Sequence, residues 1–161
     1  MLALAGLGVA ILSLTPTERA MPWLVWNASA SAPVGLYRVV ARPVERSAPV
    51  LVRPSADMAA LAAERGYLPA GVPLIKRVAA VAGDHVCAIG SAVVLHTLTV
   101  VRRLDADAAG RPLPRWSGCR RLADGEVFLL MADAPDSFDS RYFGSVPSAS
   151  VMGRLVPLWT D

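Results

Sequence analysis

Two serines and one lysine are the residues of this sequence best suited to catalytic chemistry. Ser29 and Ser31 lie two residues apart in NASASAPVGLYR, which covers residues 27–38. If this stretch is extended, side chains two residues apart point to the same side. Pro33 and Gly35 mark a turn directly behind them. A serine hydroxyl held in such a place can act as a nucleophile once another group removes its proton.

Lys76 is the candidate for the group that removes this proton. Lysine and arginine together number sixteen, and Lys76 is the single lysine among them. It lies in the apolar run PLIKRVAAV, residues 73–81. Arginine stays protonated, whereas the pKa of lysine falls readily on burial. A fall from about 10.4 to near 7 requires roughly 4 to 5 kcal/mol of desolvation and neighbouring charge.

Two alternatives to a lysine base stay open at this point. Histidine is the more usual partner of a nucleophilic serine, but no sequence signature places a carboxylate to orient His85 or His96. Lys76 could also lie at a strand edge with its amine in solvent, as most lysines do. The burial of the Lys76 amine therefore decides between these interpretations.

The composition predicts a single, mainly β domain without a nucleic-acid partner. The 161 residues are 54% hydrophobic and 6% aromatic, with 13 prolines. A chain of this length can bury a core as one domain, and short apolar runs between irregular connections are typical of strands. The net charge of +3 comes from scattered arginines without interleaved aromatic residues. We therefore expect a solvated basic surface and no binding of nucleic acid.

The expected secondary structure places the lysine in a strand and the serines just before one. The strand that carries Lys76 ends at the turn Ala82-Gly83-Asp84. A short helix is expected between Ser55, which can cap it, and Gly66. The other expected strands cover residues 36–40, 50–52, 93–101, 126–131 and 151–158, and a short one begins at residue 86.

The N-terminus is an apolar segment that suggests a membrane. Residues 1–14 carry no charge and are followed by Pro16. A helix of this length reaches roughly 21 Å, short of the ~30 Å hydrocarbon core of a bilayer. We expect residues 1–26 to be the end of a membrane anchor or signal-like segment whose basic part lies upstream, and residues 27–161 to form the catalytic domain. An apolar terminal element packed on the core is the alternative.

The cysteines and the acidic residues do not form a recognisable metal site. Cys87 and Cys119 lack CxxC spacing and a nearby histidine, so we expect no zinc. Outside the cytoplasm this pair would form one disulfide, worth roughly 3 to 4 kcal/mol for a loop of about 32 residues; two buried thiols are the alternative. The segment from residue 105 begins like a calcium loop, but Ala109 and Trp116 occupy positions that need ligands.

A third polar segment, SFDSRYFG at residues 137–144, lies between apolar ones. Together with NASASAPVGLYR and a lysine-arginine pair followed by Gly83-Asp84, it resembles the bacterial type I signal peptidase family. The longer segments NASASAPVGLYR and SFDSRYFG are most similar to the conjugative-transfer branch of that family, the TraF-type peptidases. The resemblance covers about residues 27–159. It implies a mainly β, signal-peptidase-like antiparallel fold with one short helix and an N-terminal apolar membrane anchor.

The resemblance implies a catalytic pair and an oxyanion hole. Ser31, just ahead of the proline, matches the nucleophile of the family, and Lys76 matches its general base. Ser29 matches the residue whose hydroxyl joins the nucleophile's backbone N–H in the oxyanion hole. In two departures, Ala32 stands where a methionine usually follows the nucleophile, and Ala82 replaces the proline of a Pro-Gly-Asp turn. Neither departure removes a reacting group.

Three residues of the third segment match supporting positions of the family. Ser137 matches the residue that orients the lysine amine. Asp139 and Arg141 match a pair that holds the site together, and in the TraF branch this aspartate is also considered important for activity. The resemblance implies neither a metal nor a cofactor.

The implied function is that of a membrane-associated serine endopeptidase. It would remove leader peptides from exported or conjugative-pilus precursor proteins that carry small residues before the cleavage site. Its catalytic domain would lie on the periplasmic or outer side of the inner membrane, so that its partners are the precursor and the membrane. The alternatives are a general type I signal peptidase of the secretory pathway and a catalytically silent β scaffold domain of a membrane complex.

Overall fold

The computed structural model describes residues 21–95 and 99–160. In this part of the chain the helices are α2 (Ala56–Glu64), α3 (Ser140–Phe143) and a 3-10 turn at Ser148–Ser150. The strands are β1 (Leu24–Asn27), β2 (Gly35–Val40), β3 (Pro49–Val52), β4 (Leu74–Val81), β5 (His85–Ile89), β6 (Ala92–Leu95), β7 (Thr99–Arg102), β8 (Gly118–Arg121), β9 (Glu126–Leu130), β10 (Val146–Pro147) and β11 (Val151–Thr160).

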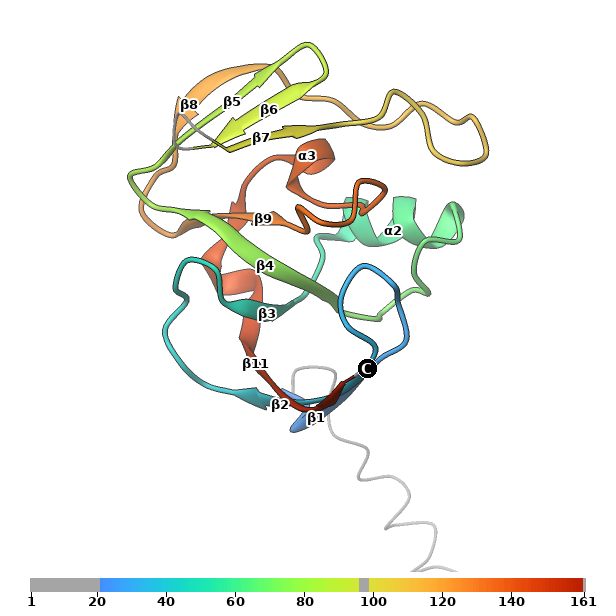
Figure 1. Cartoon of the computed structure of the whole chain (residues 1–161), viewed down its shortest axis with the longest axis vertical. Coiled ribbons are helices and arrows are strands. Elements are labelled where there is room, and N and C mark those ends of the chain that lie inside the picture. Colours follow the sequence, from blue (N-terminus) through green and yellow to red (C-terminus); the bar gives the residue numbers. More distant parts are fainter. Residues whose placement is uncertain (1–20, 96–98, 161) are drawn as a thin grey trace, which may run out of the picture.

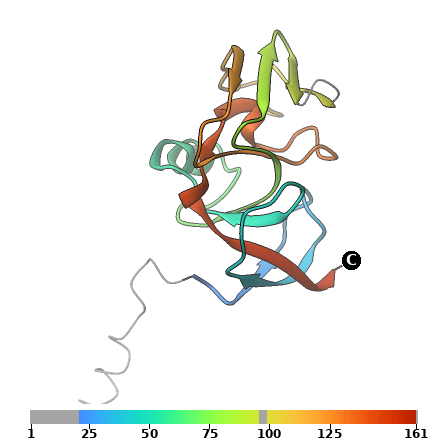
Figure 2. The same cartoon turned by 90° about the vertical axis from the view of Figure 1, so that its left-hand side faces the viewer.

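These strands form two antiparallel sheets. The larger sheet has the order β1-β2-β11-β3-β4-β9-β10, and the smaller has the order β7-β6-β5-β8. Figures 1 and 2 show the smaller sheet at one end of the molecule and β1 with β2 at the opposite end. The mainly β, antiparallel fold that the sequence predicts is confirmed.

The core follows the alternation of side chains along β4, a central strand of the larger sheet. Leu74, Lys76 and Val78 all lie on its buried side. Val50 of β3 is paired with Lys76, and Leu129 of β9 is paired with Val78. Lys76 is therefore buried because it occupies an inward position of a strand that has a partner on each side.

The predicted helix is present as α2. Its N-cap is Ser55, whose side chain accepts a backbone N–H of the first turn. Gly66, with a φ of +72°, follows its end. The buried Ala62 belongs to the same apolar cluster as Phe138. Helix α2 thus packs behind the polar segment that carries Ser137.

Two regions differ from the expected strand boundaries. Residues 24–26, grouped above with the apolar N-terminal segment, belong to β1, which pairs with β2; residues 1–20 of that segment lie outside the described residues. The expected strand 93–101 is divided between β6 and β7, which pair with each other. In the described part of the chain, no helix is long and apolar enough to cross a membrane.

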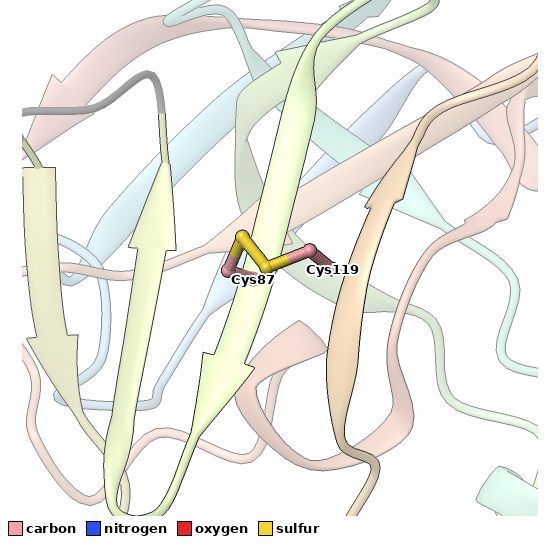
Figure 3. The surroundings of a disulfide bond; sticks show 2 residues. All are labelled: Cys87 and Cys119. Carbon is pink, nitrogen blue, oxygen red and sulfur yellow. A yellow bond between two sulfur atoms is a disulfide. The ribbon is translucent and has the colours of Figure 1, made fainter.

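Cys87 of β5 and Cys119 of β8 form a disulfide (Figure 3). The two residues are direct partners in the antiparallel register. Strand β8 is an edge strand, and all four of its residues are exposed. The disulfide therefore links the exposed edge strand β8 covalently to β5, an inner strand of the smaller sheet.

Candidate active site

Ser29 and Ser31 lie in the loop between β1 and β2. This loop passes beside the start of β4 (Figure 1), where Ala32 and Pro33 share a cavity with Ile75 and Lys76. The Oγ atoms of Ser29 and Ser31 are 3.2 Å apart. The Ser29 hydroxyl also lies 2.8 Å from Oδ1 of Asn27 and donates to it, because a carboxamide oxygen only accepts. Because the Ser29 hydroxyl proton is used in the bond to Asn27, Ser31 is the donor in the hydrogen bond between the two serines. The predicted nucleophile thus directs its proton to Ser29 in the free protein.

The side chain of Lys76 is buried, with the residue only 4% exposed. Burial lowers its pKa to about 8, while the charge of Asp139 opposes this fall and that of Arg141 adds to it. At pH 7 about one molecule in ten then carries a neutral amine that can accept a proton. The alternative of a solvent-exposed lysine at a strand edge is excluded.

The amine of Lys76 is oriented by one hydrogen bond, in which Nζ donates to Oγ of Ser137 at 2.7 Å. Ser137 is itself buried and lies in the turn after β9. Its backbone N–H donates to the carbonyl of Ala134, which fixes this turn. Ser137, which the family resemblance matches to the residue that orients the lysine amine, thus lies in contact with that amine.

The serine loop and the lysine line one small cavity. No hydrogen bond joins Lys76 to Ser31 among the described residues, since the amine bonds Ser137 and the hydroxyl bonds Ser29. Ala32, the residue after Ser31, and Lys76 nevertheless line the same cavity of about 110 Å³. Ser31 itself is not among the residues that line this cavity. The other lining residues are Pro33, Tyr37, Pro49, Ile75, Arg77, Met131, Pro157 and Thr160.

Asp139 and Arg141 form a fully buried ion pair behind this site. Nε of Arg141 donates to Oδ1 at 2.9 Å, and Nη2 donates to Oδ2 at 2.8 Å. The same guanidinium donates to the carbonyls of Met131, Ala134 and Pro135, and Asp139 accepts the backbone N–H of Met131. The predicted pair is thus present, and it fixes both ends of the turn that leads to Ser137.

Asp139 also begins a short helix that the sequence did not predict. Its side chain accepts the backbone N–H of Arg141 at the N-terminus of α3, where a carboxylate is favoured. The buried hydroxyl of Ser140 accepts the backbone N–H of Leu129 and links this turn to β9. The polar segment that could have been a surface loop is therefore part of the interior.

Two further residues contact the serine loop and were missed by the sequence analysis. Asn27 makes several hydrogen bonds to this loop, considered below. Tyr37 donates its hydroxyl to the carbonyl of Pro33 at 2.6 Å, and burial raises the pKa of Tyr37, so the phenol keeps its proton. A signal for Asn27 exists in the composition, because it is the only asparagine of the chain and glutamine is absent. Tyr37 has no comparable signal.

Comparisons with known proteins identify the family of this chain. Residues 1–159 match the family described as "Signal peptidase, peptidase S26". Two plasmid transfer proteins TraF of Escherichia coli are 36% and 38% identical over 144 and 145 residues, which is 83% of this chain and 81% of theirs. A probable conjugal transfer protein TraF of Sinorhizobium fredii is 36% identical over 138 residues, covering 79% of this chain and 72% of that protein.

Among solved structures, a signal peptidase I of Enterococcus faecalis matches with a TM-score of 0.42 and 19% identity, covering 73% of this chain and 100% of that one. The sequence matches carry the assignment, since they extend over most of the chain and of its relatives. On this ground the chain belongs to the signal peptidase family, peptidase S26.

Proposed function

We propose that this protein is a membrane-associated serine endopeptidase that removes leader peptides from conjugative-pilus or other exported precursors by means of a Ser31/Lys76 pair. The observation that carries the proposal is the buried amine of Lys76. Its pKa is lowered to about 8, and it lines the same cavity as the residue next to Ser31. The TraF names of the relatives favour the conjugative substrate over a general role in secretion.

The proposed reaction begins when the neutral amine of Lys76 accepts the proton of Ser31. The freed Oγ attacks the scissile carbonyl carbon, and Lys76 then returns the proton to the leaving amine. Water hydrolyses the resulting acyl-enzyme in a second cycle of the same proton transfers. Because Ser137 accepts one hydrogen of Nζ, the amine lone pair is free to face the nucleophile.

The oxyanion that forms during attack needs donors close to Ser31. The backbone N–H of Ser31 and the hydroxyl of Ser29 would supply them. The Ser29 hydroxyl donates to Asn27 in the free protein, so it has to turn toward the oxyanion when substrate binds. A donor of this kind contributes about 3 to 4 kcal/mol to stabilisation of the transition state in other serine hydrolases.

The size of the cavity supports a substrate with small side chains before the cleavage site. At about 110 Å³, with mainly apolar lining residues beside Lys76, it suits an alanine better than an aromatic side chain. The family resemblance implies the same preference. An extended precursor segment bound along a strand edge would present such residues to the nucleophile.

Exposed aromatic residues support a location at a membrane surface. Trp26 of β1 and Trp159 of β11 stack with ring centroids 5.6 Å apart, and both are exposed. Trp23, which precedes β1, is exposed as well. Tryptophan is typical of the interface between bilayer and water. Trp23 and Trp26 lie at the end of the apolar N-terminal segment, which we propose as the anchor that holds the catalytic domain at the periplasmic side of the inner membrane.

Mass spectrometry of a pilin precursor incubated with the protein in lipid vesicles tests this proposal. We expect two fragments whose masses add up to the precursor plus one water, with the cut after a small residue. The matched control is the same precursor with tryptophan at that position, which should stay intact because the cavity cannot hold an indole. An intact precursor in both reactions would favour the scaffold alternative, and equal cleavage of both would contradict the proposed site.

A further inference from the structure

Asn27, the last residue of β1, is joined to the serine loop by a set of hydrogen bonds to one carboxamide. Its Nδ2 donates to the carbonyl oxygens of Ser29, Ala32 and Pro33, each at 3.0 Å. Its Oδ1 accepts the backbone N–H of Ser29 at 3.1 Å and the hydroxyl of Ser29 at 2.8 Å. The residue is 5% exposed. A single buried side chain therefore holds both ends of the loop that contains Ser31.

Only a carboxamide of this length satisfies these partners. The three carbonyls share the two hydrogens of Nδ2, and the two donors of Ser29 need an acceptor. Aspartate offers acceptors alone, and a serine is too short to bridge the loop. Asn27 is also the only side-chain amide in the 161 residues. An asparagine at position 27 therefore fits the donors and acceptors of this loop.

Asn27 is linked to the proposed nucleophile, Ser31, through the hydroxyl of Ser29. Because the Ser29 proton lies on the bond to Asn27, the Oγ of Ser29 accepts the proton of Ser31. Turning the Ser31 hydroxyl away from Ser29 therefore breaks this one hydrogen bond. A second anchor, the bond from Tyr37 to the carbonyl of Pro33, holds the far end of the loop.

From this network we propose that Asn27 is a positioning residue, whose carboxamide fixes the backbone of residues 28–33 and so places Ser31 Oγ within reach of the Lys76 amine. The inference rests on the proposed function. Asn27 itself contacts no reacting atom. Its effect is expected mainly on the chemical step, with a smaller change in KM, because Ala32 and Pro33 are the members of this loop that line the cavity.

Two substitutions separate the donor and acceptor parts of this role. Asn27→Ala removes all the bonds, whereas Asn27→Asp keeps the acceptors and loses the donors to the three carbonyls. We expect both variants to lower kcat for a leader peptide by about 10- to 100-fold, with KM changed by less than about threefold. The pH midpoint of activity should stay where it is, because the surroundings of Lys76 on β4 are unchanged.

Glu126→Ala is the matched control. Glu126, the first residue of β9, accepts hydrogen bonds from the backbone of Ala123 and from the side chains of Arg120 and Ser145. None of these partners belongs to the serine loop. Hydrogen exchange of residues 28–34 is measured on all variants as a second readout. We expect faster exchange of this segment in Asn27→Ala and Asn27→Asp, and parent-like exchange and kcat in Glu126→Ala.

The outcomes separate this inference from the proposed function. If the parent cleaves the peptide and Asn27→Ala matches its kcat, the positioning role is wrong while the peptidase stands. If the parent does not cleave, the proposed function fails, and exchange alone decides whether Asn27 orders the loop. Unchanged exchange of residues 28–34 in Asn27→Ala overturns the inference in either case. A loss that appears in KM alone also overturns it.

Discussion

Lys76→Met is expected to lower kcat/KM for leader cleavage by about 10³-fold or more, because the only proposed proton acceptor is lost. Methionine keeps an apolar stem of similar length in the buried position. The fold should therefore persist, since no amine remains to be desolvated. Ser31→Ala should cost about as much, and the double variant should be no slower than either single one, because the two residues act in the same step.

The control for this prediction is Arg38→Met on β2, an exposed basic residue of a strand in the same sheet. It should cleave like the parent. Peptide cleavage with purified variants, after circular dichroism has shown that each is folded, gives the comparison. Activity of Lys76→Met within tenfold of the parent would mean that another group removes the proton from Ser31.

Asp139→Ala is expected to lower the free energy of unfolding by about 3 to 5 kcal/mol, because it leaves the guanidinium of Arg141 buried without its counter-ion. That is a large share of the 5 to 15 kcal/mol by which domains are typically stable. The turn that carries Ser137 loses the same support. We therefore expect leader cleavage to fall as well, even at temperatures where the variant is folded.

Urea denaturation of two further variants tests the cause. Glu45→Ala removes the partner of Arg154 from a largely exposed pair and should cost no more than about 1 kcal/mol. The double variant Asp139→Ala/Arg141→Met should be more stable than Asp139→Ala alone, because it leaves no unpaired charge inside. If Asp139→Ala costs as little as Glu45→Ala, the ion pair does not support the site as described.

The local features of this fold could be predicted from single residues. Ser55 and Gly66 bound the helix α2 by capping chemistry that acts within one turn. The apolar run around Lys76 predicted a strand; that its side chain faces inward, where burial lowers its pKa, was decided only by the structure. A disulfide between Cys87 and Cys119 was expected for a domain outside the cytoplasm, and the structure contains this bond. The helix caps and the strand depend on residues that are neighbours in sequence, and the disulfide depends on a single pair of cysteines.

The long-range features could not be predicted, because they depend on which strands pair. Strand β11 lies between β2 and β3 in the larger sheet, a neighbourhood that no local pattern indicates. The burial of the segment that begins at Ser137 follows from its packing against α2, far away in sequence. The bonds of Asn27 join residues that are close in sequence, but they form only when the loop between β1 and β2 folds back over this side chain. The residue types were visible in the sequence, while their surroundings were not.

The pH dependence of kcat/KM for a leader peptide tests the Ser31/Lys76 account most directly. Burial disfavours the charged amine and lowers the pKa of Lys76 from 10.5 to about 8, and only the neutral amine can take the proton of Ser31. The neutral fraction grows from about 1% at pH 6 to about one half at pH 8, so the account predicts a rise of about 50-fold followed by a plateau. A rate that is flat or falls over this range would contradict it.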